Sequence, residues 1–452
     1  MTFTRFNDAL RIAAFAVRAA ALPEQWPVRI VRDVYGRIRF AVNCDRADYP
    51  EAARQQLDAI QVALGAYAKS HILFRDDFTD PDEIFDGANW HLTTVNDMPD
   101  AAGITAPDVT IAVLDRQITG QDWLNPTPSE TTHPHRLVFY GLKGGVGRST
   151  ALAMVAHGLA RRGKRVLLID FDLESPGLSG LLLPPERVAE FGLVDWFVED
   201  AVGQGDSVLR SMVSTSPLAD ATTGRIRVAA AMGQSETAYL AKLARAYAEM
   251  PGTNGSQRFG ARMQRIVELL EAQEKPDVVL IDSRAGLHDV AAVAITSLAD
   301  TALLFATDSA QNWLGYRQLF MHWEHHPEVC ARVRDRLAIV RALTPQGNRE
   351  AQVRWFQENA YDLFARTLYD EIEPTFEPES MAALEAPESF HPAMEDESAP
   401  HFPILIDWDT RFQEFDPTLR PENGGVGDAQ IDATFGALID WTMKRISGDE
   451  ID

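Results

Sequence analysis

The chain has 452 residues, with 42 Lys and Arg against 66 Asp and Glu, so its formal net charge is −24. A composition of 46% hydrophobic and 24% charged residues is typical of globular proteins and excludes wholesale disorder, collagen and coiled coil. The acidic balance argues against nucleic-acid binding and against a general attraction to anionic membranes, because both need clustered Lys and Arg. Two cysteines, Cys44 and Cys330, cannot form a disulfide framework, and we expect a cytoplasmic protein without a membrane span.

The first 124 residues predict a small α+β domain whose role the sequence does not reveal. Two helices are expected in it, over residues 6–21 and 50–69. Between them, alternating apolar runs at 28–34 and 38–42 flank the dipeptide Tyr35-Gly36, which predicts a β-hairpin. Residues 125–135 are rich in Pro, Thr and Ser and lack an apolar period, so we expect them to form a linker.

From residue 136 to residue 452, strands alternate with helices. The strand candidates are short apolar runs bounded by charge, as expected for strands buried on both faces. They are residues 136–141, 165–171, 225–230, 277–282, 301–307 and 337–343. Helices are expected over residues 149–162, 257–273 and 431–446. This alternation predicts an α/β domain with a doubly wound, mostly parallel sheet.

Residues 367–410 contain no Lys or Arg, whereas Asp and Glu recur throughout and several prolines interrupt the segment. The simplest interpretation of this charge pattern is an acidic insertion that forms a surface loop of the domain. The alternative is a docking segment for a basic partner protein.

Two histidines, His322 and His326, have the i, i+4 spacing that places side chains on one face of a helix. No convincing third ligand lies nearby in the sequence, and Pro327 would end the helix. We therefore interpret the pair as surface or capping residues rather than as zinc ligands.

Residues 136–172 predict a phosphate-binding loop between a buried strand and a helix. The segment reads RLVFYGLKGGVGRSTALAMVAHGLARRGKRVLLIDFD. Its glycines permit a tight turn whose backbone N–H groups converge on phosphate oxygens, and the N-terminus of the following helix adds the positive end of its dipole. Ser149 stands where a hydroxyl would complete the Mg²⁺ shell between the phosphates. The residues expected to bind nucleotide are Gly144, Gly145, Val146, Gly147, Arg148, Ser149 and Thr150.

Residues 143–150, KGGVGRST, depart from the ordinary GxxxxGK[ST] pattern, because Leu142 replaces its first Gly and Arg148 replaces its Lys. They resemble the deviant Walker A loop of the ParA/MinD superfamily of P-loop ATPases, and more narrowly the subgroup that reads KGGVGR. The resemblance covers residues 136–452 and implies ATP and Mg²⁺ as cofactors. It also implies that Lys143 reaches across an ATP-sandwiched homodimer to the phosphates of the second copy. Arg148 keeps the charge of the usual Lys in a planar fork, which puts the hydrolysis rate more than binding in question.

Two aspartates, Asp170 and Asp172, follow the next apolar strand, at the edge of the sheet where ligands bind in such folds. By the resemblance, Asp172 would position or activate the attacking water, so that Lys143, Arg148 and Asp172 make up the catalytic set. Asp170 is expected to close the strand. For either aspartate the alternative is a carboxylate that only caps the loop.

A further apolar strand ends at Asp282 and resembles a Walker B strand. Asp282 would hold Mg²⁺ through water, together with Ser149. Gly286, four residues later, would supply a flexible amide near the γ-phosphate, as in the second switch of the superfamily. Arg284 has two open roles, a contact with phosphate or an ion pair with Asp289.

The leading hypothesis is therefore an ATP-binding, ATP-hydrolysing dimerisation switch that controls a protein partner. The alternative is a nucleotide-dependent interaction module with little or no turnover, in which the N-terminal domain or the acidic segment binds the partner in one nucleotide state. Arg148 is the residue that motivates the alternative. A DNA-partition ATPase ranks lower because of the net charge of −24.

Overall fold

The computed structural model describes residues 4–86, 90–96, 107–117, 119–125, 132–234, 238–252, 255–371, 389–413, 415–416, 419 and 425–448. The chain divides into two compact units. The first comprises Met1–Asn125 and Met321–Ala331, and the second comprises Pro126–Phe320 and Arg332–Asp452. Residues 321–331, expected in the second domain, therefore belong to the first, and most of the expected linker, 126–131, lies outside the described residues. Among the described residues, no helix is long and apolar enough to cross a membrane.

The first unit contains a four-stranded sheet in the order β2-β1-β4-β3. Its strands are β1 (Val28–Arg32), β2 (Ile38–Val42), β3 (His91–Val95) and β4 (Val109–Asp115). The antiparallel pairing of β1 with β2 confirms the expected hairpin, whereas β3 and β4 were not predicted. Its helices are α1 (Phe6–Ala19), α2 (Glu51–Ala63), the short α3 (Pro81–Phe85) and most of α12 (Pro327–Val333). Residues such as Ala13, Ile30, Phe40 and Leu57 form its apolar core.

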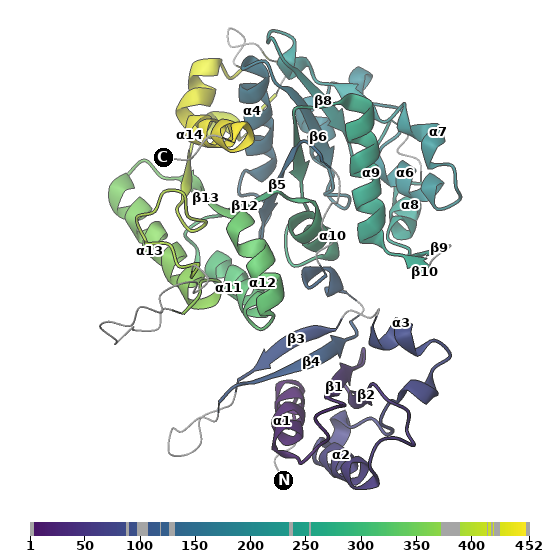
Figure 1. Ribbon diagram of the computed structural model, residues 1–452. Helices are drawn as coiled ribbons and strands as arrows, with labels where there is room; N and C mark the ends of the chain where they lie inside the picture. The colour runs from purple at the N-terminus through teal and green to yellow at the C-terminus, as the bar shows by residue number, and fades with distance from the viewer. Residues whose placement is uncertain are drawn as a thin grey trace. The chain divides into compact units, whose positions relative to one another are not determined.

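The second unit is built on an eight-stranded sheet in the order β14-β13-β12-β5-β11-β6-β8-β7 (Figure 1). Every pairing in it is parallel except the one between β7 and β8, which confirms a doubly wound, mostly parallel sheet. Its strands are β5 (His135–Gly141), β6 (Arg165–Asp170), β7 (Val213–Thr215), β8 (Arg225–Ala229), β11 (Val278–Asp282), β12 (Thr301–Ala306), β13 (Leu337–Thr344) and β14 (Ile404–Asp407). Two short strands, β9 (Met250–Gly252) and β10 (Gly255–Gln257), pair separately.

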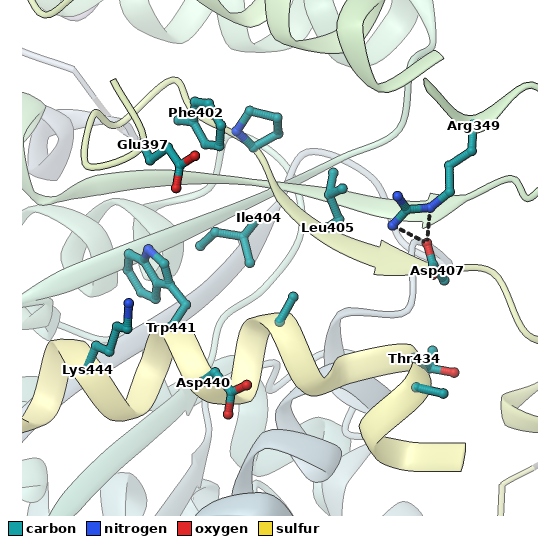
Figure 2. A pocket seen from close by; sticks show the side chains of 13 residues that line it. Arg349, Glu397, Phe402, Ile404, Leu405, Asp407, Thr434, Asp440, Trp441 and Lys444 are labelled. Carbon is teal, nitrogen blue, oxygen red and sulfur yellow. Dashed lines mark hydrogen bonds and ion pairs between the residues drawn. The ribbon is translucent and has the colours of Figure 1, made fainter. Parts of the chain in front are cut away.

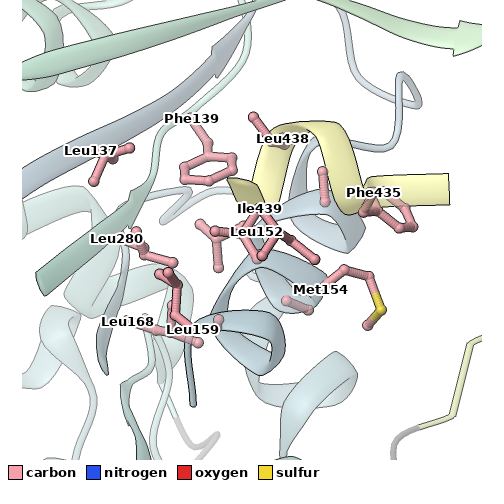
Figure 3. Close-up of a cluster of buried hydrophobic side chains, with 14 of the residues drawn as sticks. Leu137, Phe139, Leu152, Met154, Leu159, Leu168, Leu280, Phe435, Leu438 and Ile439 are labelled. Atoms are coloured by element: carbon pink, nitrogen blue, oxygen red, sulfur yellow. The ribbon is translucent and has the colours of Figure 1, made fainter. Parts of the chain in front are cut away.

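Helices cover both faces of this sheet, because alternate residues of each strand enter different cores. Leu137 and Phe139 of β5 pack with α4 and α14, and Gly158 of α4 lies so close to Ile439 of α14 that a Cβ would clash (Figure 3). On the other face, Arg136 pairs with Glu271 of α9. The helices are α4 (Arg148–Arg161), α5 (Leu178–Leu182), α6 (Leu193–Asp200), α7 (Gly205–Leu209), α8 (Tyr239–Ala246), α9 (Phe259–Glu274), α10 (Asp289–Val293), α11 (Ala310–Glu324), α13 (Arg349–Thr367) and α14 (Asp428–Ser447).

The prediction that residues 367–410 form a surface loop is wrong for their last part. Residues 404–407 form the edge strand β14, with Ile404 and Ile406 buried against the helices. His401 is fully buried, and its Nδ1 lies 2.6 Å from the hydroxyl of Tyr369. An alternation of apolar residues decides the structure here, although the charge pattern of the segment suggested otherwise. Residues 372–388 lie outside the described residues, and the docking alternative stays a prediction.

Of the two roles expected for His326, surface or capping, the surface role is wrong. Its side chain is 7% exposed within the first unit, 3.4 Å from the hydroxyl of Thr93 on β3, and its ring contacts the ring of His91. The reason is that residues 321–331 pack on β3, a strand that the sequence pattern did not predict. In the described parts of the chain, no group of three His, Cys, Asp or Glu residues could hold a metal ion.

Candidate functional site

The phosphate loop connects the end of β5 to the start of α4. Gly145 and Gly147 have φ angles of 78° and 79°, in the left-handed region where a Cβ would be strained. A Cβ built at Gly144 or Gly145 would meet no atom within 4 Å, so the space above the loop is open. The first turn of α4 adds N–H groups that the helix itself does not pair. Local sequence therefore creates a backbone cradle for an anion at this edge of the sheet.

Arg148, the residue that replaces the usual Lys, points back into the sheet and is 8% exposed. Its Nε donates to Asp282 Oδ1 at 2.6 Å, and its Nη2 donates to Asp172 Oδ2 at 3.0 Å. The buried Nη1 has no hydrogen-bond partner among the described residues. A buried donor without an acceptor is costly, so the third arm of the guanidinium is suited to a ligand oxygen.

Ser149 and Asp282 meet beside this guanidinium. The Ser149 hydroxyl donates to Asp282 Oδ2 at 2.6 Å, and Asp282 is 1% exposed at the end of β11. Since β11 lies between β5 and β6, the strand order brings the loop and both acidic strand ends together. A hydroxyl next to a carboxylate is the donor set that Mg²⁺ prefers, so these two residues fit the expected cation.

The two aspartates after β6 have different surroundings. Asp170 is fully buried and accepts the backbone N–H groups of Asp172 and Leu178, both at 3.1 Å, so it shapes the following loop. Burial raises the pKa of Asp170 well above its usual range, and the charge of Asp282 adds to the effect. Burial also raises the pKa of Asp172, which the guanidinium of Arg148 partly offsets. Asp172 is the one that faces the candidate site.

The loop after β11 is anchored on the strand that carries the phosphate loop. Gly286 has a φ of 86°, and its N–H donates to the carbonyl of Gly141 at 3.1 Å. The hydroxyl of Tyr140 donates to the Gly286 carbonyl at 3.2 Å. In this structure the Gly286 amide is thus engaged within the chain. Arg284 forms an ion pair with Glu174, a partner that neither alternative for its role had named.

Lys143, at the start of the loop, donates a hydrogen bond to Gln311 of α11. It lies apart from the contacts that Arg148 makes with the two carboxylates. Its expected reach into a second copy stays a prediction.

A cavity of about 330 Å³ adjoins the phosphate loop. Its other walls come from β13, from the residues after β14 and from α14, so sequence reasoning missed it along with β14. The available signal was the apolar run ILIDWD at residues 404–409, which includes the half-exposed Trp408. Its lining residues are Gly145, Val146, Gly147, Thr150, Leu343, Ile406, Asp407, Trp408, Asp409, Phe412, Gln413, Thr434 and Phe435.

A second cavity, of about 340 Å³, lies between β14 and α14 (Figure 2). Arg349 and Asp407 form an ion pair at one end of it, with N–O distances of 3.1 Å, and Trp441 and Lys444 lie at the other. It contains none of the predicted site residues. The cavity at the phosphate loop is therefore the candidate nucleotide pocket.

Comparison with known proteins agrees with this geometry. Residues 137–300 match the family described as the CobQ/CobB/MinD/ParA nucleotide binding domain. The septum site-determining protein MinD of Escherichia coli is 40% identical over 67 residues, 15% of this chain and 22% of MinD. The chromosome-partitioning ATPase Soj of Thermus thermophilus is 46% identical over 52 residues, 12% of this chain and 21% of Soj. The chain thus spans about a fifth of the length of these curated relatives.

Among solved structures, a ParA family ATPase from Chlorobium tepidum TLS is similar with a TM-score of 0.41 and 16% identity. That similarity covers 68% of this chain and 98% of the other. The assignment rests on the family match over residues 137–300 and on the loop itself. Residues 137–300 are therefore similar to the CobQ/CobB/MinD/ParA nucleotide binding domain.

Proposed function

We propose that this protein is an ATP- and Mg²⁺-dependent switch that dimerises around bound ATP, hydrolyses it and thereby controls a protein partner. The observation that carries the proposal is the convergence at one sheet edge of an open phosphate loop, a hydroxyl–carboxylate pair and the buried charges of Arg148 and Asp172. Such a group of charges is costly to bury, and clusters of buried ionisable groups beside an open loop are typical of functional sites. Two cysteines in 452 residues cannot form a disulfide framework, which accords with the proposed cytoplasmic location.

Binding of the nucleotide would use the loop for the phosphates and the adjoining cavity for the base. The loop amides and the unpaired Nη1 of Arg148 are the donors for phosphate oxygens. Trp408, at the rim of the cavity, offers an aromatic face for a base. The choice of ATP over GTP rests on the family likeness.

Ser149 and Asp282 would hold the Mg²⁺ ion, which, when bound, neutralises charge on the phosphate oxygens. Arg148 places a permanent positive charge at the same edge. Its contact with Asp172 engages the carboxylate that is proposed to orient water. A turn of the Arg148 side chain toward phosphate would free Asp172 for that role, so nucleotide binding and the readiness of Asp172 would be coupled.

Two exposed leucines support association of two copies at this face. Leu287, next to Gly286, is 55% exposed, and Leu314, on the helix that carries Gln311, is 59% exposed. Gly315 of the same helix packs on Leu142 of the phosphate loop, which places Leu314 near the nucleotide site. The buried core of a protein–protein interface is more apolar than the surrounding surface, so these two leucines suit a contact with a second copy.

The second candidate function is a nucleotide-dependent interaction module with little or no turnover. The ion pair between Arg148 and Asp172 favours it, because Arg148 engages one oxygen of the carboxylate that is proposed to orient water. In either case we propose the first unit or residues 367–410 as the surface for the partner protein.

The experiment that tests the proposal is light scattering on a sizing column with Mg²⁺–ATP and with Mg²⁺–ADP, combined with a phosphate-release assay. We expect a dimer with ATP alone, and we expect Asp172→Ala to remain a dimer and to lose at least tenfold in turnover. An unchanged mass with nucleotide still bound would favour the interaction module. Wild-type turnover by Asp172→Ala would refute the role of Asp172. An ATP-driven, salt-sensitive gel shift of DNA would revive the partition ATPase.

A further inference from the structure

Glu174 connects three segments that are distant in the sequence. It lies two residues after Asp172, on the loop that follows β6. Its side chain forms an ion pair with Arg284 on the loop after β11, and its Oε1 accepts a hydrogen bond from the hydroxyl of Tyr247 after α8. His288 Nε2 lies 4.0 Å from the same oxygen.

Each loop that Glu174 joins is also anchored elsewhere in the second unit. Asp170 accepts the N–H groups of Asp172 and Leu178 and so fixes both ends of the first loop. The second loop is fixed on β5, through Gly286 and Gly141. The ion pair between Glu174 and Arg284 is therefore a direct tie between the loop that carries Asp172 and the loop that carries Gly286.

The ion pair between Glu174 and Arg284 is expected to contribute little to the stability of the fold. Both side chains are partly exposed, 25% for Glu174 and 31% for Arg284, and ion pairs in such positions stabilise folds little. The second oxygen of Glu174, Oε2, is buried and has no hydrogen-bond partner among the described residues. The buried hydroxyl of Ser283, beside Arg284, also has none in the part of the chain that the structure describes. Buried polar atoms that the fold leaves unsatisfied call for a reason other than stability, such as a functional role.

We propose that Glu174 is a positioning residue for the site: it holds Arg284 so that the loop of Asp172 and the loop of Gly286 move as one unit. This proposal rests on the proposed nucleotide switch. A displacement of either loop would then be transmitted to the other, and the reacting groups would reach the phosphate together. A small misplacement of a reacting group lowers a rate far more than it lowers affinity.

The variants that test the tie are Glu174→Gln, Arg284→Gln and their combination. Glu174→Gln keeps the length of the side chain and an oxygen for Tyr247 but removes the charge. The matched control is Asp220→Asn, which removes the exposed ion pair with Arg187 elsewhere in the second unit. We expect each single variant and the double variant to lose about tenfold in kcat, with affinity for a fluorescent ATP analogue within about twofold of wild type. The control should change neither quantity.

A double variant that loses the product of the two single effects would overturn the proposal, because residues that act through one contact are not additive. So would a loss of affinity with kcat unchanged. A second readout, amide hydrogen exchange with Mg²⁺ and the ATP analogue, does not depend on turnover. Glu174→Gln should speed exchange in residues 283–288, and Arg284→Gln should speed it in residues 171–178. Exchange that changes only in the substituted loop would refute the tie. Absence of wild-type turnover would count against the proposed hydrolysis, and the exchange result would still decide the role of Glu174.

Discussion

Two regions of the molecule bury ionisable side chains, and the buried side chain is charged in one region and neutral in the other. At the phosphate loop, Arg148 remains charged because Asp282 and Asp172 lie within 3.0 Å of its nitrogens. In the first unit, His326 packs ring to ring with His91 and with His322. Burial lowers the pKa of His326 to about 3, with further lowering from His322 and the neighbouring histidines, so its imidazole is neutral at pH 7.

The difference shows which region is suited to a ligand. The paired charges at the loop retain an unused buried donor, and the guanidinium can exchange one partner for another. His326 lies beside the hydroxyl of Thr93, a contact that a neutral imidazole can make. Beside the open phosphate loop the paired charges therefore suit a ligand, whereas the neutral imidazole of His326 suits a packed contact between β3 and residues 321–331.

Removal of the Arg148 guanidinium should give the largest loss of stability among the changes considered. Arg148→Met leaves two buried carboxylates without a cation, so we expect the free energy of unfolding at pH 7 to fall by about 3–5 kcal/mol in chemical denaturation. Arg148→Lys keeps the charge and should lose less. The matched pair is Arg136 with Glu271, which is buried away from the loop: Glu271→Gln should lower stability and leave nucleotide affinity unchanged. An Arg148→Met protein as stable as wild type would contradict the charged state of this region.

The second largest loss of stability is expected around His326 when the pH is lowered. Because the pKa of His326 is lower in the folded than in the unfolded chain, the unfolded chain binds more protons below pH 6.5, and stability falls as the pH falls. Between pH 6.5 and pH 5 the loss should approach 2 kcal/mol, at about 1.4 kcal/mol per pH unit. His322, His325 and Asp115 also face this imidazole.

Amide hydrogen exchange in residues 91–95, at pH 7 and pH 5, measures this loss where it arises. His326→Gln should make the protection of β3 less sensitive to pH. The control is His71→Asn, at an exposed position whose φ of 76° suits Asn. Equal sensitivity to pH in wild type and His326→Gln would exclude His326 as the cause.

The smallest change in free energy is expected at Ser149 and Asp282, the proposed Mg²⁺-binding pair, and it concerns nucleotide affinity. Ser149→Ala removes the hydroxyl and leaves the contact of Arg148 with Asp282 in place. We expect affinity for an ATP analogue to fall about tenfold with Mg²⁺, close to 1.4 kcal/mol. With a chelator in place of Mg²⁺, wild type and Ser149→Ala should bind equally. A loss of affinity that is the same with and without Mg²⁺ would assign Ser149 to phosphate binding instead.

Features set by residues close together in the sequence were predicted correctly, whereas features set by residues far apart in the sequence were missed. β5, α4, the loop between them and β6 lie within one short segment, where glycine positions and apolar periods act locally, and these elements were predicted correctly. Burial also alternates along β14, where Ile404 and Ile406 are buried. The acidic residues around this strand led us to predict a loop, so β14 was missed. The cavity that it helps to line was therefore missed as well. The burial of His326 was missed because its partner strand, β3, was not predicted.

The sequence by itself determined the strand–loop–helix unit, the need for glycine at residues 145 and 147, and the placement of Asp172 and Asp282 at strand ends. Only the tertiary structure decided what Arg148 contacts, since its partners lie 24 and 134 residues away and meet it through the order of β5, β11 and β6. It also decided that Arg284 meets Glu174 and that residues 321–331 belong to the first unit. The physical reason is that local periodicity specifies which face of a strand is buried, whereas strand order depends on packing across the whole sheet.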